Sequence, residues 1–173
     1  MIGLSIRQAQ GLFFDRQAVT RAVSRSERKV LSRFGAYVRT SARSSIRPAR
    51  RKNLSELTPE EQRRYRMRVR IARQLGRPRP KLPLAHSRPG EPPRSITGLL
   101  RRFLYFAFDP SRRSVVIGPA RISSGSGAPE TLEHGGFTKR GSRRVRIDAR
   151  PYMGPALERE QVQLPALWRN SVR

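Results

Sequence analysis

A proline-rich segment between residues 76 and 98 divides the chain into two parts of different character. Its sequence, GRPRPKLPLAHSRPGEPPRSITG, places a proline every few residues. Proline fits neither the interior of a helix nor the ladder of a sheet. The segment is therefore predicted to be an extended arm or linker. The part before it carries helical patterns, and the part after it carries mostly strand and turn patterns.

A long amphipathic helix is predicted from Asp15 to about Ile46. Asp15 is a good N-cap, and Phe14 before it is placed to pack on Val19 as a hydrophobic staple. Arginines fall mostly on the side opposite the apolar residues, and Pro48 ends the helix. Gly35 is a weak point within it. The stripe expected to be buried consists of Val19, Val23, Val30, Phe34 and Val38.

A second helix has clear signals at both ends. Thr58 is the predicted N-cap, Pro59 occupies the first helical position, Glu61 completes a capping box, and Gly76 stops the helix. Its narrow apolar stripe is formed by Tyr65, Val69, Ala72 and Leu75. Its remaining faces carry arginines, namely Arg63, Arg64, Arg66, Arg68, Arg70 and Arg73.

The part after the prolines predicts short strands and a final helix. Alternation over residues 104–108, a DPSRR turn and SVVIGP indicate a hairpin, and FTKRGSRRVRID indicates another that ends in a strand near 143–147. Pro155 opens a C-terminal helix, and Pro165 kinks or restarts it. The expected fold class is α+β, with the long N-terminal helix (1–48) and the C-terminal helix packed on a small antiparallel sheet (97–173). The basic helix and proline-rich arm (49–96) are an insertion.

The balance of charge limits what the protein does. The chain of 173 residues has 38 Lys and Arg against 12 Asp and Glu, a net charge of +26. Such an excess repels itself unless nucleic acid, a membrane surface or an acidic protein neutralises it. A GC-rich genome that favours arginine codons explains the preference for arginine over lysine equally well, but it does not explain the net charge. A chain that is only 36% hydrophobic buries a modest core, which favours assembly with copies or partners.

The sequence offers little for catalysis or for ligand binding. It has no cysteine, and neither of its histidines, His86 and His134, has a second ligand pattern beside it. The G-x-S-x-G elbow and the phosphate-binding loop are both missing. We therefore expect no enzymatic activity, no metal and no cofactor. No apolar run reaches the length of a membrane span, so we expect a protein made in a cytoplasm.

Three roles remain open for the arginine helix. It suits a track for DNA phosphates, it suits pairing with an acidic neighbour, and it is also compatible with a merely solvated face. No DNA-reading motif is present, and the aromatic residues do not alternate with the arginines. A membrane-surface role is disfavoured because the apolar stripe is narrow and lacks Trp or Phe.

The second half of the chain resembles a known family. In order, it contains a proline-rich stretch before ITGL, then VVIGP, LEHGG and ARPYMGPAL. This order resembles the neck, or tail-completion (head–tail joining), proteins of long-tailed bacteriophages, over roughly residues 87–172. Residues 49–82 depart from the compact family pattern. The matching corner comprises Arg150, Pro151, Tyr152, Pro155, Ala156 and Leu157.

The resemblance implies a structural subunit of the virion neck that forms a ring around the DNA channel. A hexamer is favoured, because phage tails are sixfold, and a dodecamer comes second. Its implied partners are neighbouring neck and tail proteins, with non-specific contact to genomic DNA and none with membranes. Independently of the family, Tyr152 and Leu157 are expected to be buried where the last helix meets the sheet. The alternative function is a basic nucleic-acid-binding protein without enzymatic activity.

Overall fold

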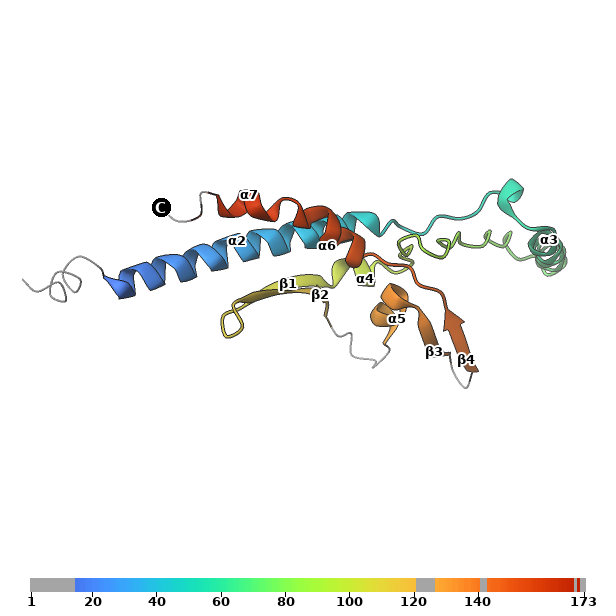
Figure 1. Ribbon diagram of the computed structural model, residues 1–173. Coiled ribbons are helices and arrows are strands. Elements are labelled where there is room, and N and C mark those ends of the chain that lie inside the picture. The colour runs from blue at the N-terminus through green and yellow to red at the C-terminus, as the bar shows by residue number, and fades with distance from the viewer. Residues whose placement is uncertain (1–14, 121–126, 141–142, 170, 172–173) are drawn as a thin grey trace, which may run out of the picture. The chain divides into compact units, whose positions relative to one another are not determined.

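The computed structural model describes residues 15–120, 127–140, 143–169 and 171 (Figure 1). The fold is α+β, as predicted, with helices and small antiparallel sheets. The chain divides into two compact units. The long-helix unit comprises Met1–Ser44, Phe103–Gly125 and Met153–Arg173. The arginine-helix unit comprises Ser45–Arg102 and Ser126–Tyr152.

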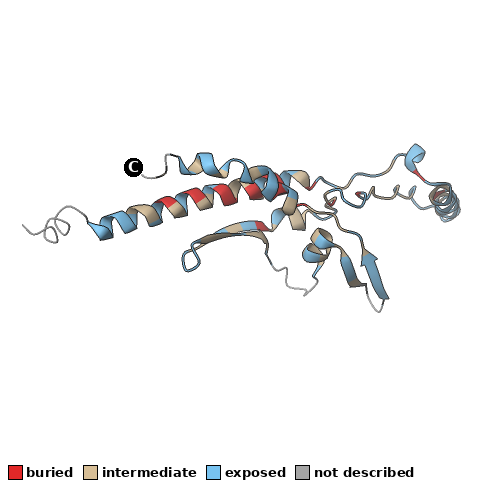
Figure 2. Cartoon of the chain, viewed as in Figure 1, coloured by how far each residue is buried: buried red, intermediate tan, exposed pale blue. Residues whose placement is uncertain are grey.

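The predicted first helix is α2 (Arg16–Ser45). Its N-cap is confirmed, because the Asp15 carboxylate accepts a hydrogen bond from the Ala18 amide at 2.9 Å. Val19 is 44% exposed, so the expected buried stripe is wrong at its start, and the partner proposed for it, Phe14, lies outside the described residues. Burial begins later and follows a row of every fourth residue (Figure 2), formed by Ser26, Val30, Phe34, Val38 and Ala42.

A hairpin packs on α2 in the long-helix unit. It consists of β1 (Leu104–Asp109) and β2 (Ser114–Pro119), paired antiparallel. The predicted alternation is confirmed, since Leu104 is buried and Tyr105 is half exposed. The Asp109 carboxylate accepts a hydrogen bond from the Ser111 amide in the turn. Arg113, at the end of the turn, forms an ion pair with Glu27 of α2, which fastens the tip of the hairpin to the helix.

Gly35 lies where α2 closely approaches the hairpin. A Cβ atom at this position would lie 2.7 Å from Val115 Cγ2 and 3.0 Å from Phe106 Cδ2. One turn further along the helix, the Arg39 guanidinium donates a hydrogen bond to the Leu104 carbonyl at 2.6 Å. The glycine that weakens the helix in the sequence therefore has a packing role.

The C-terminal part forms α6 (Gly154–Gln161) and α7 (Leu164–Trp168), with the predicted restart at Pro165. These helices run beside α2 in Figure 1, and the Ser26 hydroxyl donates to the Ser171 carbonyl at 2.6 Å. Ala156 is buried, but Leu157 is 43% exposed, so its predicted burial is wrong. A helix of about two turns buries one narrow side, and the residue that follows Ala156 is turned about 100° away from it.

The arginine-helix unit contains the remaining elements. They are the 3₁₀ turn η1 (Leu54–Glu56), α3 (Pro59–Gln74), α4 (Leu99–Arg102), α5 (Ala128–His134), β3 (Gly136–Arg140) and β4 (Arg143–Ile147). The second predicted hairpin is confirmed as β3–β4. The single expected sheet is not formed, because the described strands make two separate two-stranded sheets. Residues 126–152 group with the predicted insertion rather than with the long helix.

The proline-rich arm is extended, as predicted, but it does not reach freely into solvent. It runs back along residues 47–52 and bonds to them through the backbone. The Ala85 amide donates to the Arg50 carbonyl at 2.7 Å, and the Lys52 amide donates to the Pro83 carbonyl at 2.9 Å. The hydrogen bonds run in both directions, since the arm donates from Ala85 and accepts through the Pro83 carbonyl; proline lacks a donor but keeps its acceptor.

The ARPYMGP corner ends the arginine-helix unit. Tyr152 is 1% exposed, which confirms its predicted burial. Its amide donates to the Glu133 carboxylate at 2.9 Å, and burial together with the charge of Glu133 raises the pKa of Tyr152 to about 12. Arg150 donates from its amide to the Leu132 carbonyl at 2.6 Å and from Nε to the Ser87 carbonyl at 3.3 Å. Pro151 is partly buried.

Candidate interaction surface on the arginine helix

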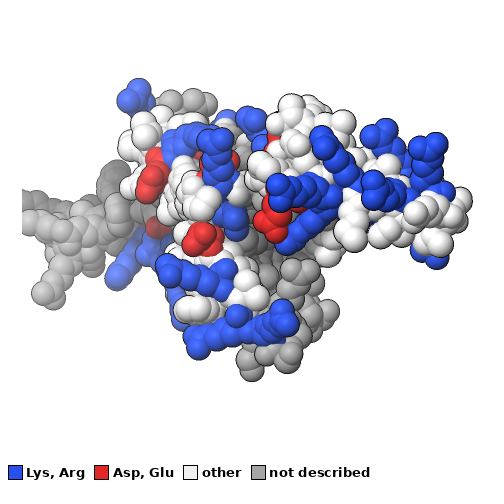
Figure 3. Space-filling view, turned by 90° about the vertical axis from the view of Figure 1, so that its right-hand side faces the viewer, with Lys and Arg blue, Asp and Glu red and all other residues white. Residues whose placement is uncertain are grey.

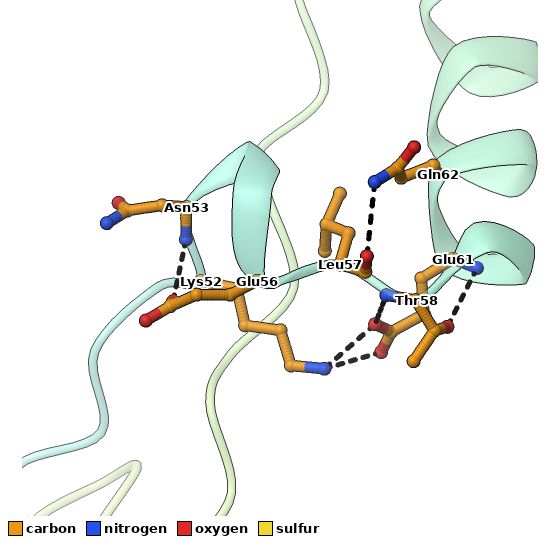
Figure 4. Close-up of polar contacts among 7 residues, drawn as sticks. All are labelled: Lys52, Asn53, Glu56, Leu57, Thr58, Glu61 and Gln62. Atoms are coloured by element: carbon orange, nitrogen blue, oxygen red, sulfur yellow. Dashed lines mark hydrogen bonds and ion pairs between the residues drawn. The ribbon is translucent and has the colours of Figure 1, made fainter.

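The beginning of α3 is held by a predicted capping box that the structure confirms (Figure 4). The Glu61 amide donates to the Thr58 hydroxyl at 3.3 Å, and the Thr58 amide donates to the Glu61 carboxylate at 3.0 Å. Lys52 Nζ reaches the same carboxylate at 2.7 and 2.8 Å. The hydrogen bonds from Lys52 and from the Thr58 amide hold the pKa of Glu61 below its ordinary value. The start of the helix is thus fastened to the extended segment that precedes it.

A second carboxylate is fastened in the same way just before α3. Glu56 accepts from Arg50 Nη1 at 2.8 Å and from the Asn53 amide at 2.9 Å. The hydrogen bond from Arg50 is the main cause that lowers the pKa of Glu56 to about 2. Both carboxylates are therefore ionised at neutral pH, and both are engaged by cations of their own unit.

One side of α3 packs within its own unit. Tyr65 is 7% exposed. Arg79 from the arm donates to the Tyr65 hydroxyl at 3.1 Å, and its guanidinium lies 5.9 Å from the ring centroid. Val69 and Ala72 are partly buried. A cavity of about 510 Å³ beside Tyr65 is lined by Leu54, Ser55, Gln62, Tyr65, Arg66, Val69 and Arg79.

The predicted stripe fails at its last member. Leu75 is 58% exposed. It is the C-cap of α3, and Gly76 follows it with a φ of 61°, which confirms the predicted stop. Leu75 lies almost three turns beyond Tyr65, past the residues that cover the inner side.

The predicted arginines of α3 are all exposed. Arg64 pairs with Glu60 at 2.5 Å, one turn before it. Within the described residues, no ion pair is made by Arg63, Arg66, Arg68, Arg70 or Arg73. Exposed apolar residues lie between these arginines and were not predicted from the sequence. Met67 and Ile71 are 65% and 45% exposed, and their spacing of four residues, continued by Leu75, was the available signal.

The positive charge is not neutralised locally. All 12 acidic residues fall within the described part of the chain, and four ion pairs engage Glu27, Glu56, Glu60 and Glu61. Asp15, Glu91 and Asp109 accept from nearby backbone amides. Lys and Arg side chains consequently dominate the face in Figure 3, with few acidic groups among them. Most of the Lys and Arg side chains therefore have no acidic partner within the described part of the chain.

The described residues contain no group of three or more side chains suited to hold a metal ion. In the same part of the chain, no helix is long and apolar enough to cross a membrane. His86 and His134 are both exposed, in the arm and at the end of α5. Comparisons with protein-family models, with curated proteins and with solved structures find no match. The residues and their geometry therefore carry the functional argument.

Proposed function

We propose that the chain is a structural subunit of the neck that joins head and tail in a tailed bacteriophage, acting as part of a ring around the DNA channel. The observation that carries the proposal is the place of the family-like motifs. VVIGP forms most of β2, LEHGG ends α5 and begins β3, and ARPYMGPAL forms the corner before α6. All three set strands and bends, as expected of motifs that fix the shape of a subunit.

An exposed apolar face on β1–β2 supports a role in assembly. Tyr105 and Val116 lie on the same face of this hairpin and are 50% and 62% exposed. On β3–β4, Phe137 and Val145 are 56% and 40% exposed and lie on opposite faces. A two-stranded sheet leaves unpaired edges and is marginally stable by itself. Faces of this kind gain stability from neighbouring subunits, which would cover the apolar side chains and extend the sheets.

A closed ring is the proposed form of that assembly. Head-to-tail contacts between different surfaces of one subunit close into rings when the rotation allows it. Sixfold symmetry is the first expectation because phage tails are sixfold, and twelvefold symmetry is the second. A basic lining suits a DNA channel, since charge on phosphates is met without reading sequence.

The test is the presence and symmetry of the protein in particles. Electron microscopy of virions, with the subunit located by an antibody or a fused tag, should place it at the head–tail junction. Native mass spectrometry of the purified protein should show a hexamer or a dodecamer. A protein that stays monomeric and is absent from mature particles would contradict the proposal.

The alternative, a basic nucleic-acid-binding protein without enzymatic activity, is favoured by the five arginines of α3 that form no ion pair with the described residues. The salt dependence of binding distinguishes contacts with nucleic acid from contacts with a neighbouring subunit. Binding through phosphates weakens by roughly 0.9 log units per contact for each log unit of salt. Partly buried pairs with a protein neighbour are screened much less.

A further inference from the structure

The outer side of α3 carries an apolar ridge inside the basic surface. Met67, Ile71 and Leu75 recur every four residues and therefore share one side of the helix. Their exposed fractions are 65%, 45% and 58%. The ridge spans about 12 Å along the helix axis, at 1.5 Å per residue. Unlike Tyr65 on the inner side, none of the three is buried within its own unit.

Arginines border this ridge. Arg63, Arg64 and Arg70 each lie three or four positions from Met67, and Arg68 lies three positions before Ile71, so all four neighbour the ridge on the helix surface. Arg66 lies towards the inner side instead, where it lines the cavity beside Tyr65, and Arg73, four positions after Val69, is turned the same way. An apolar seam flanked by like charges is the pattern of a helix that packs on a second helix of opposite charge.

We infer that the outer side of α3 binds an amphipathic helix of another protein, with its apolar residues on the ridge and its Asp and Glu residues facing the bordering arginines. Duplex DNA offers phosphates for the arginines but nothing that covers three adjacent apolar side chains. A second copy of this chain brings the same excess of positive charge, and its acidic residues are largely engaged. The inference does not depend on the neck assignment.

The probe is a synthetic helical peptide of about 20 residues, long enough to span the ridge, with leucines at every fourth position flanked by glutamates. A peptide of the same composition with scrambled order is its control. Fluorescence anisotropy with the full chain should show binding of the first peptide and not of the second. Duplex DNA and anionic lipid vesicles, tested in the same buffer, stand for the competing occupants.

Three double variants distinguish the contribution of the ridge to binding from that of the charge. Met67→Gln with Ile71→Gln removes the ridge without changing charge, and it should weaken peptide binding about tenfold or more, since two exposed apolar side chains lose their burial. DNA binding should be unchanged by it. Arg63→Gln with Arg70→Gln should weaken peptide binding more than the matched pair Arg66→Gln with Arg73→Gln, which removes equal charge from the other side.

All substituted side chains are exposed. Circular dichroism with thermal unfolding checks that each variant stays folded. If the double ridge variant does not fold, the single Met67→Gln variant replaces it. Equal peptide binding by the ridge variant and the wild-type chain would overturn the inference. So would binding to DNA or vesicles that depends on Met67 and Ile71, or self-association that the same variant abolishes while the peptide fails to bind. Absence of the protein from virions would contradict the neck proposal alone.

Discussion

Two positions in the ARPYMGPAL motif show how far the burial of a single residue can be predicted from the sequence. Tyr152 and Leu157 are both large and apolar, and the pattern predicted both to be buried. Tyr152 is almost fully buried, whereas Leu157 is 43% exposed. The apolar character of a residue indicates that it can be buried, but the length of the helix it stands on decides how many sides are covered. Helix α6 is too short to cover both Ala156 and Leu157.

Replacing these two residues by alanine should therefore have unequal effects on stability. Tyr152→Ala removes a buried ring and should lower the free energy of unfolding by about 3–5 kcal/mol. Leu157→Ala removes a side chain that is partly in water and should lower it by about 1 kcal/mol or less. Urea unfolding of both variants measures the difference. Equal destabilisation would mean that Leu157 is covered in solution.

The phenol of Tyr152 should make stability depend on alkaline pH. Its pKa is raised to about 12 in the folded chain, against about 10 for an ordinary tyrosine. A raised pKa contributes stability that is fully present below about pH 10 and is lost as the pH rises towards about 12. Unfolding midpoints measured across this range should fall less steeply for Tyr152→Phe than for the wild-type chain. Parallel curves would contradict the assignment.

Gly35 reverses the usual rule for a glycine within a helix. Gly→Ala in a helix normally stabilises it by about 1 kcal/mol. Here the new Cβ would lie 2.7 Å from Val115 Cγ2, and a β-branched valine has little freedom to move away. We expect Gly35→Ala to lower the free energy of unfolding by about 1–2 kcal/mol. The double variant with Val115→Ala should be less than additive, and additivity would argue against the contact.

Elements with strong end signals were predictable in their bounds. Thr58, Pro59 and Glu61 define the beginning of α3, and Gly76 its end, because capping is chemistry between residues close in sequence. The proline arm was predictable as extended but not as tied to residues 47–52. That contact joins residues more than thirty positions apart, and a proline carbonyl that accepts a hydrogen bond from a distant segment leaves no periodic signal in the sequence.

The capping box gives an expectation for the arginine helix as an element. Thr58→Ala should lower stability by about 1 kcal/mol and should loosen the first turn of α3. Hydrogen exchange measured by nuclear magnetic resonance should show faster exchange at the Glu61 amide, which donates to the Thr58 hydroxyl. Thr58→Ser keeps the acceptor and is the matched control. Unchanged exchange in the alanine variant would mean that Lys52 and Glu61 hold the helix without the box.

For the whole molecule, the fold class was predictable and the grouping of elements was not. The patterns of strands and helices indicate α+β, and both hairpins lie where turn signals and alternation placed them. A single sheet was the economical expectation for four short strands. Pairing between hairpins depends on contacts remote in sequence, and the edges of β1–β2 and β3–β4 carry no signal that excludes or requires it. The arginines of the candidate surface were predicted from the sequence, whereas its apolar ridge was not.

Assembly should depend on the exposed face of the β1–β2 hairpin. Val116 is 62% exposed, so Val116→Lys should leave the free energy of unfolding of the isolated chain within about 0.5 kcal/mol of the wild-type value. If neighbouring subunits cover this face, the same change should reduce the oligomer fraction in analytical ultracentrifugation. Arg112→Lys, in the exposed turn of the same hairpin, is the control. Full assembly of the Val116→Lys chain would exclude this face from the subunit contacts.

The contact between Pro48 and Ser95 has a consequence for how such a chain arises. These residues are bridge partners, which places their backbones about 5 Å apart, although 46 positions separate them. The excursion formed by residues 49–94, which includes α3, therefore begins and ends at almost the same point in the fold. A single genetic event can add or remove it without moving the flanking backbone. Relatives that lack the excursion, or carry a different one, are therefore expected to retain the other strands and helices, with another partner for Arg150 in place of the Ser87 carbonyl.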